Sequence, residues 1–328
     1  MKKAPNNSED FLLSDSHFEG NNFQTFLEKI SDIASSPSLI KQTITSSGIH
    51  KQKAQVYIRN FEHPTNYVPV FCEISIGVDL IHYRGVHMSR YSESIFELAS
   101  EKFDDLSIFA EKLAKTIRER QKSNIGMVDI FGTYIHRKLT KKSQLLSSDC
   151  LHLIARARST KNEIALQTGM QVYNMTACPC TKTHTKYMIA PELKSLGLTI
   201  DQINKILQIT MPATHTQRGT TTLIVDKEKT NISHQNIYSI LEESTHLVYD
   251  LLKRSDEHDL VIRAIQNPQF TEDVAREVAA NTYGHLKDKL SPNANVYIES
   301  ILNDAIHIHD VRTVIESTMG NISQDLNS

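Results

Sequence analysis

Several features that would place a protein in a specialised class are scarce or missing from this sequence. No run of about 18 apolar residues occurs, so the sequence predicts no membrane span. The 328 residues carry a formal net charge of -2, so the chain has no overall basic field of the kind that favours nucleic acid. The first residues lead into a polar, acidic segment with no apolar signal core, and we therefore expect a cytoplasmic protein.

Cysteine is scarce as well, which argues against a framework of disulfide bonds. The chain has four cysteines, and in a reducing compartment thiols or metal ligands are more common than disulfides. Cys72 and Cys150 lie in or beside apolar, strand-like stretches, which is typical of inert core thiols. Cys178 and Cys180 differ from them, because these two stand one residue apart in a polar, basic segment.

Length and composition predict a globular protein. A hydrophobic fraction of 39% and a charged fraction of 23% are ordinary for soluble proteins. A chain of this length forms one large domain or two medium ones. Residues 1–30 are rich in Asn, Ser, Asp and Glu, so a loosely ordered N-terminal arm is expected there.

After the arm, two regions share one pattern of strands and helices, roughly β-β-α-α-β-β, which predicts an α+β fold. For residues 31–160 the periodicity predicts strands at 55–59 and 68–80, one long helical pattern at 92–121 in which the two helices of the unit are merged, and strands at 127–136 and 151–155. For residues 161–328 it predicts strands at 164–174 and 220–225, helices at 234–253 and 272–286, and strands at 295–298 and 305–308. A further helix at 200–209 is interpreted as an insertion. Such units leave sheet edges open, and pairing of edges between subunits to close a barrel is one remedy, which favours an oligomer.

The segment Cys178-Pro179-Cys180 is a good candidate for part of a metal site. Residues i and i+2 of an extended segment point the same way, so one thiolate could bind a metal while the other stays close by. Thiolate, imidazole and carboxylate ligands together suit zinc or ferrous iron better than magnesium or calcium. Two ordinary cysteines, or a redox pair, would produce the same pattern.

Other polar residues are ambiguous when each is taken alone. His215 precedes Arg218, whose guanidinium could bind phosphate, yet an isolated histidine is more often a satisfied surface or core residue. Glu257 belongs to a charged run near a helix end, which is usually a solvated surface. Glu272 stands at an expected helix start, where the helix dipole alone favours an acidic residue.

Two further segments could take part in chemistry. His307 and His309 alternate with isoleucines on an expected strand, so both imidazoles would face one side as ligands or as an acid–base pair. The segment 84–91 places arginine, histidine and serine before an expected helix, where they could hold a polyphosphate. An ordinary strand-to-helix turn is the alternative.

Together, six ordered motifs resemble the type IB GTP cyclohydrolases, the metal-dependent prokaryotic form of GTP cyclohydrolase I, and the resemblance extends over nearly the whole chain after the arm. The motifs are Gly85-Val86-His87-Met88-Ser89-Arg90, Cys178-Pro179-Cys180-Thr181-Lys182, His215-Thr216-Gln217-Arg218-Gly219, Lys253-Arg254-Ser255-Asp256-Glu257, Asn267-Pro268-Gln269-Phe270-Thr271-Glu272-Asp273 and His307-Ile308-His309-Asp310.

The resemblance implies a fold, a reaction and a set of partners. The fold would be the tunnelling fold (T-fold), in which tandem β-β-α-α-β-β units assemble into barrels, and the protein would be a homotetramer. GTP and water would be converted to 7,8-dihydroneopterin triphosphate and formate, a reaction that feeds tetrahydrofolate and queuosine synthesis. A divalent metal, zinc, manganese or iron, would be the cofactor. The charge balance and the lack of a long apolar run predict that neither nucleic acid nor a membrane is a partner.

The resemblance also implies residue roles. The metal ligands would be Cys178, His215 and Glu257, with His307 as a fourth ligand or near neighbour. Glu272 would anchor the guanine ring, because an ionised carboxylate accepts from two adjacent N–H donors.

Catalysis and triphosphate binding complete the implied site. A metal with an open position would activate water for attack on the purine, and the imidazoles would transfer protons. The expected catalytic residues are Cys178, Cys180, His307 and His309. The expected triphosphate ligands are His87, Ser89 and Arg90, with Lys182 and Arg218 as further candidates.

The chain departs from the family pattern in places, and other functions stay open. Thr181, Thr216 and Asp304 stand where Ser, Asn and Glu are common, and the stretch between Cys180 and His215 is longer than expected. One alternative is a nitrile reductase of queuosine synthesis, with a cysteine nucleophile and a nicotinamide cofactor. Another is a non-catalytic zinc-binding scaffold. Within the family, a cyclic phosphate product is a further alternative.

Overall fold

The computed structural model describes residues 33–81, 83–228, 230–250 and 253–328. The arm expected at residues 1–30 lies outside this part of the chain. Within it, nine strands form one continuous sheet in the order β3-β1-β2-β4-β5-β6-β7-β8-β9. Neighbouring strands are antiparallel, except that the short β3 runs parallel to β1.

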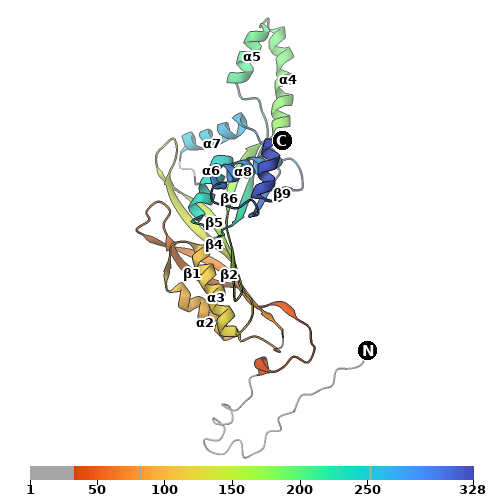
Figure 1. The fold of residues 1–328 in the computed structure, drawn as a ribbon. Coiled ribbons are helices and arrows are strands. Elements are labelled where there is room, and N and C mark those ends of the chain that lie inside the picture. The colour runs from red at the N-terminus through yellow and green to blue at the C-terminus, as the bar shows by residue number, and fades with distance from the viewer. Residues whose placement is uncertain (1–32, 82, 229, 251–252) are drawn as a thin grey trace, which may run out of the picture.

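In the part of the first half that the structure describes, the chain supplies five strands and two long helices (Figure 1). A short 3-10 turn, Ile33–Ser35, precedes them. The strands are β1 (Ile44–Arg59), β2 (Tyr67–Leu80), β3 (Lys102–Phe103), β4 (Gly126–Leu139) and β5 (Leu146–Ser159). The helices are α2 (Met88–Ala99) and α3 (Leu106–Gln121).

The second half supplies four strands and six helices in the described residues. The strands are β6 (Ile164–Ala177), β7 (Thr216–Asp226), β8 (Asn295–Leu302) and β9 (Val311–Thr318). The helices are α4 (Pro179–Ser195), α5 (Ile200–Ile209), α6 (His234–Ser244), α7 (Arg254–Gln266), α8 (Thr271–Leu286) and α9 (Met319–Asn327). In Figure 1, α4 and α5 extend away from the rest of the molecule as a helical hairpin.

One face of the sheet is covered by helices from both halves, and the buried apolar side chains form one core beneath them. Burial alternates along β4, so successive side chains lie on opposite faces of the sheet. Val128 and Ile130 are buried under α3, whereas Asp129 and Phe131 are exposed on the opposite, open face. Among the described residues, no helix is both long and apolar enough to cross a bilayer.

The predicted tunnelling fold, with two separate tandem units, is wrong for this chain. β5 and β6 pair across the expected boundary between residues 160 and 161, from Ser159–Ile164 to His152–Gln171. The two halves therefore form one nine-stranded sheet that continues across the expected boundary. Extra helices also break the expected pattern, because α4 precedes the predicted insertion helix α5 between β6 and β7, and α7 lies between α6 and α8.

The long helical pattern predicted at 92–121, in which two helices were expected to merge, consists of α2 and α3 with β3 between them. Asp105 ends the interruption by capping α3, since its side chain accepts a hydrogen bond from the main-chain N–H of Ser107 at 2.9 Å. The apolar stripe continues through this break, so periodicity alone did not reveal it.

Two other predicted elements end differently. The helix expected at 234–253 is α6, which ends at Ser244, and Leu247 then forms a bridge with Asn174 of β6. The strand expected at 305–308 is a loop, and β9 begins only at Val311. The helix expected at 200–209 coincides with α5.

Candidate functional site

Cys178 and His215 are brought together at one end of the sheet. Cys178 follows the last residue of β6, and His215 precedes the first residue of β7. Their strands are paired up to Ala177 and Thr216. One step further, the main-chain N–H of Cys178 donates to the carbonyl of His215 at 3.1 Å. Sheet register therefore holds the predicted thiolate and imidazole opposite each other.

Cys178 is also the N-cap residue of α4. Its sulfur accepts a hydrogen bond from the main-chain N–H of Thr181 at 3.4 Å, and Pro179 occupies the first helical position. The N-terminal N–H groups of a helix favour negative charge, which suits a sulfur that acts as a metal ligand. Cys180 lies in the first turn of the same helix and is exposed.

The loop that connects β8 and β9 lies at the same end of the sheet. The main-chain N–H of Asn303 donates to the carbonyl of Arg218 on β7 at 2.9 Å. Asp304 then closes a turn, because its carboxylate accepts the N–H groups of Ile306 at 2.8 Å and His307 at 3.2 Å. These hydrogen bonds, with the nearby charges of His307 and His215, lower the pKa of Asp304. Asp304 is thus a site residue that sequence reasoning did not assign, and its turn-forming position before His307 is the signal for it.

His307 and His309 lie side by side in this loop rather than on a strand. Their rings stack with centroids 5.3 Å apart and planes 3° from parallel. Both residues are exposed, and the intervening Ile308 is fully exposed. The expected pairing of the two imidazoles is therefore present, but the Asp304 turn positions them.

Glu257 is exposed and does not join Cys178 and His215. It lies in the first turn of α7, whereas the C-terminal carbonyls of α7, those of Ile265 and Gln266, accept hydrogen bonds from Lys182 Nζ at 2.6 and 3.1 Å. Glu257 is nine residues before Gln266, so it lies about 13 Å further along the helix. No cluster of three or more His, Cys, Asp or Glu side chains suited to a metal occurs in the described ranges.

The neighbour of Glu257, Asp256, fixes the start of α7. Its carboxylate accepts the main-chain N–H groups of Lys142 and Ser143 at 3.1 Å and the hydroxyl of Ser143 at 2.5 Å. Asp256 is almost fully buried. The sequence motif indicated Glu257, which is the exposed acid of this pair. The two acids lie on different faces of α7, and Asp256 is on the buried face.

Lys182, a predicted triphosphate ligand, links α4 to the C-terminus of α7. Its ammonium caps the C-terminus of α7, as described above, and burial together with Lys186 lowers its pKa. A cation is favourable at a helix C-terminus. Arg218 is exposed on the open face of β7.

Beneath the start of α8 lies a group of buried polar side chains next to His215. Thr271, the residue before Glu272, donates from its hydroxyl to the carbonyl of Ser300 on β8 at 3.2 Å, while Glu272 itself is exposed. Several buried polar atoms here have no hydrogen-bond partner in the described part of the chain. They are Asn174 Nδ2, Thr176 Oγ1, His215 Nδ1, Gln217 Oε1, Gln269 Oε1 and Ser300 Oγ.

These atoms come from neighbouring strands and from the residues just before α8. Thr176 is the register partner of Gln217, and Ser300 is paired with Thr221 of β7. Buried polar groups in native proteins are nearly always hydrogen-bonded, so these atoms are available to an ordered water, an ion or a ligand. His215, whose Nδ1 has no hydrogen-bond partner, is joined through its main chain to Cys178, and this imidazole and thiol are donor types that suit a metal preferring nitrogen and sulfur ligands.

Three of the five predicted triphosphate residues lie at the opposite end of the sheet. His87, Ser89 and Arg90 stand at the start of α2, after the last residue of β2. His87 and Arg90 line part of a cavity of about 480 Å³ with Gln121. Gln121 donates to the carbonyl of His87 at 2.8 Å. β2 and β6 each have 14 residues, and a strand of that length spans about 45 Å. Within one chain, therefore, these residues do not share a site with Cys178.

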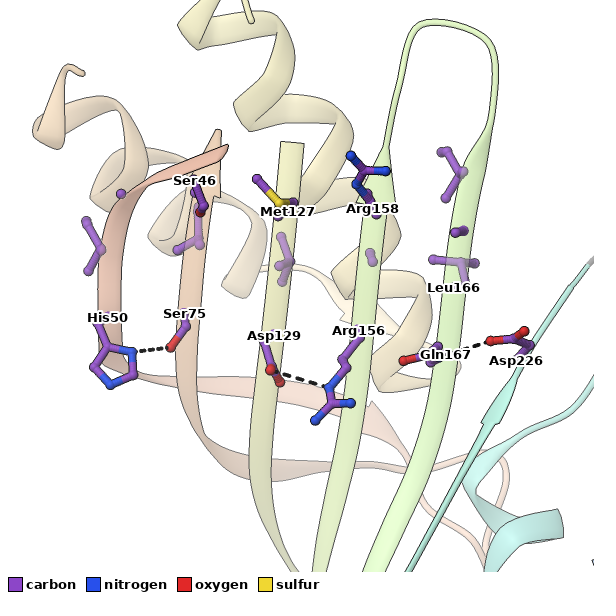
Figure 2. Close-up of a pocket in the computed structure, with 18 of the residues that line it drawn as sticks. Ser46, His50, Ser75, Met127, Asp129, Arg156, Arg158, Leu166, Gln167 and Asp226 are labelled. Carbon is purple, nitrogen blue, oxygen red and sulfur yellow. Dashed lines mark hydrogen bonds and ion pairs between the residues drawn. The ribbon is translucent and has the colours of Figure 1, made fainter. Parts of the chain in front are cut away.

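A larger cavity, of 790 Å³, lies on the open face of the sheet near that far end. Figure 2 shows that its polar side chains are directed mainly at one another. His50 contacts Ser75 at 3.0 Å, Asp129 contacts Arg156 at 3.4 Å, and Gln167 donates to Asp226 at 3.0 Å. None of the residues predicted for the site lines this cavity.

Comparison with known proteins identifies similar sequences over most of the chain. A family model described as "Type I GTP cyclohydrolase folE2" matches residues 30–313. A GTP cyclohydrolase MptA from Methanococcus aeolicus is 28% identical over 309 residues, which cover 90% of this chain and 99% of that protein. One from Methanosphaera stadtmanae is 27% identical over 300 residues, covering 86% of this chain and 93% of that protein.

Among solved structures, a uricase from Arthrobacter globiformis superposes with a TM-score of 0.46 and 9% identity, covering 84% of this chain and 94% of that one. The sequence matches correct the family predicted from the motifs. The type IB GTP cyclohydrolases were expected, whereas the matching family is folE2 and the similar proteins are MptA proteins.

Proposed function

Because the chain belongs to the Type I GTP cyclohydrolase folE2 family, we propose that it hydrolyses the imidazole ring of GTP and releases C8 as formate. The observation that supports this most is the pairing of Cys178 with His215 beside a group of unpaired buried polar atoms. The proposed product is 7,8-dihydroneopterin triphosphate, and the proposed role is the first step of tetrahydrofolate and queuosine synthesis in the cytoplasm.

Cys178 and His215 are the residues proposed to hold a divalent metal, zinc, manganese or iron. Such a metal, when bound, supplies an activated water. Glu257 is proposed as a further ligand, and it would reach the pair only after a change in the position of α7 or from another copy of the chain. His307, which lies next to Asp304 and is stacked on His309, is proposed to transfer protons during ring opening.

The guanine ring is proposed to lie against the start of α8. The carboxylate of Glu272 would accept from the two adjacent N–H donors of guanine. The buried patch offers what the other edges of a purine need, because Asn174 Nδ2 is a donor, Gln269 Oε1 is an acceptor and the hydroxyl of Ser300 can serve as either.

A complete GTP site is proposed to require two copies of the chain. His87, Ser89 and Arg90 lie at the opposite end of the sheet from Cys178, and strands of 14 residues, about 45 Å long, lie between the two ends. A second copy could place its α2 start beside the Cys178 end of the first. We therefore propose a homo-oligomer, with the homotetramer expected from the sequence as its size.

The experiment that tests this function is turnover of GTP by metal-stripped protein, with zinc, manganese or ferrous iron added back. Formate release and fluorescence of the oxidised pterin are both measured, and phosphorus NMR distinguishes a triphosphate product from a cyclic phosphate. Metal-dependent formation of both products is expected from the wild type and not from Cys178→Ala. Absence of both products with every metal, from folded protein, would contradict the proposal.

A further inference from the structure

The α4–α5 hairpin is inserted directly between Cys178 and His215, and side-chain hydroxyls join its two ends. Thr214, next to His215, donates from Oγ1 to the carbonyl of Cys178 at 2.7 Å. Thr185, in the second turn of α4, lies with Oγ1 2.8 Å from the carbonyl of Ala213. Both contacts lie at the base of the hairpin, where it leaves the sheet.

We propose that Thr214 is a positioning residue for the Cys178–His215 pair, and that Thr185 supports it. This inference rests on the proposed function, because it takes Cys178 and His215 as metal ligands. Nothing in the reaction requires a threonine hydroxyl to touch GTP or the metal. The hydroxyl acts through the main chain of Cys178.

The bonds around Cys178 explain why Thr214 has this role. Pairing of β6 with β7 ends at Ala177 and Thr216, and the Cys178–His215 hydrogen bond is the last main-chain bond between the strands in the described structure. The carbonyl of Cys178 then accepts from the Thr214 hydroxyl and from the main-chain N–H of Lys182 at 3.3 Å. Thr214 thus adds a second link across the strands at the point where the ladder ends and α4 begins.

The hairpin itself does little to hold this geometry. α4 has no buried residue, and Ile203 is the only buried residue of α5. Elements with few buried contacts open locally at low free-energy cost. The bonds at the base, rather than packing of the hairpin, are therefore what keep Cys178 and His215 at a fixed separation.

Thr185 is expected to contribute less than Thr214. Its Oγ1 lies near two carbonyls, that of Ala213 and that of Thr181 at 2.9 Å. A hydroxyl has one proton to donate, so the link to Ala213 is shared with a bond inside α4. The hydroxyl of Thr214 makes one hydrogen bond, and that bond crosses the two ends of the hairpin.

The hairpin offers a matched control in Thr210. Its hydroxyl donates to the carbonyl of Ile206 at 2.6 Å, which is a bond within the end of α5. Thr210→Val removes the same hydroxyl from the same hairpin without touching its base. Thr214→Ser is the conservative rescue, because serine keeps the hydroxyl and loses the methyl group.

The test is titration of full-length, metal-stripped protein with cobalt(II), which reports on ligands through a thiolate-to-cobalt absorption band and ligand-field bands. Loss of an outer residue that orients a metal ligand weakens binding by about 10- to 100-fold. We expect Thr214→Val to weaken cobalt binding by about 10-fold or more and to shift the ligand-field bands. Thr185→Val should show a smaller loss, while Thr214→Ser and Thr210→Val should match the wild type.

The outcomes separate this inference from the proposed function. A wild-type protein without a thiolate-to-cobalt band would refute the metal site itself. A wild-type band with the same affinity and spectrum in Thr214→Val would overturn the role of Thr214 and leave the metal site intact. If Thr214→Val does not fold, Thr185→Val decides, and wild-type cobalt affinity in that variant overturns the inference.

Discussion

The carboxylate of Asp105 contacts Nδ1 of His234 at 2.8 Å and accepts the main-chain N–H of the same residue at 3.1 Å. Asp105 caps α3 in the first half of the chain, and His234 is the first residue of α6 in the second. Lys227 Nζ lies 3.6 Å from the same carboxylate. This buried cluster therefore fastens the helices of the two halves to each other, above the sheet that they share.

Asp105→Asn should lower stability and flatten its dependence on pH in acid. Burial would raise the pKa of Asp105, but His234, Lys227 and Ser107 hold it well below its ordinary value. The resulting stabilisation is complete above the unfolded-state pKa of about 3.9 and is lost as the pH falls towards the folded-state pKa. Removing one partner from a buried pair costs about 3 to 5 kcal/mol. Denaturant unfolding of both proteins at several pH values measures this.

The neighbouring acid provides the control for this prediction. Asp104 pairs with Arg59, and both side chains are well exposed. Exposed pairs contribute about 0 to 1 kcal/mol, so Asp104→Asn should unfold close to the wild-type midpoint. Equal losses from Asp104→Asn and Asp105→Asn would show that the buried cluster has no special role.

Local signals in the sequence predicted those structural elements that short-range interactions determine. The helix at 200–209 coincides with α5 because Thr199 and Gln202 form a capping box at its start. The helix break at Asp105 and the turn at Asp304 also depend on side-chain hydrogen bonds to nearby main chain, yet apolar periodicity masked both. None of these local signals predicted the single sheet, because the pairing of β5 with β6 depends on strand register.

In the candidate site, too, some features were predicted from the sequence and others depend on how the strands pair. Motif order brought Cys178 and His215 forward as partners, and strand register places them together. Sequence reasoning could not reveal that Arg90 lies at the opposite end of the sheet, because that depends on the direction in which β2 and β6 cross it. It also missed Thr214, whose hydroxyl matters only after β6 and β7 have paired.

Of the two closely spaced thiols, only Cys178 should be needed for metal binding. Its sulfur lies at the capping position of α4, whereas Cys180 is exposed in the first turn. We expect Cys178→Ala to lose the thiolate-to-cobalt band and to lower GTP turnover by at least about 100-fold. Cys180→Ala should keep the band. A band that disappears in Cys180→Ala and persists in Cys178→Ala would reverse the assignment.

Glu272→Gln should lose GTP turnover and keep metal binding. The amide retains one acceptor oxygen but brings an N–H group towards the donors of guanine, so the paired hydrogen bonds are broken. A loss of at least about 100-fold in kcat/KM is expected, since a site built for polar groups rejects unpaired ones strongly. Asp273→Asn is the control, because Asp273 caps α8 by accepting the N–H of Phe270 at 3.0 Å. Loss of cobalt binding in Glu272→Gln would instead make Glu272 part of the metal site.

Mixing two inactive variants should restore activity if the site is shared between copies. In Cys178→Ala the triphosphate residues are intact, and in Arg90→Ala the metal residues are intact. Because these residues lie at opposite ends of one chain, a hybrid oligomer can combine a wild-type Cys178 from one copy with a wild-type Arg90 from another. Random exchange of subunits would make about a quarter of the sites complete.

The deciding comparison is of GTP turnover by the two variants before and after their subunits have exchanged. The two variants are unfolded and refolded together, or expressed together with different tags and isolated as the hybrid, and GTP turnover is measured against each variant alone. Cys178→Ala combined with His215→Ala is the control, because both defects lie at the same end of the sheet and no hybrid site gains both residues from paired copies. Activity that stays at the level of the separate variants in both mixtures would contradict a site shared between copies of the chain.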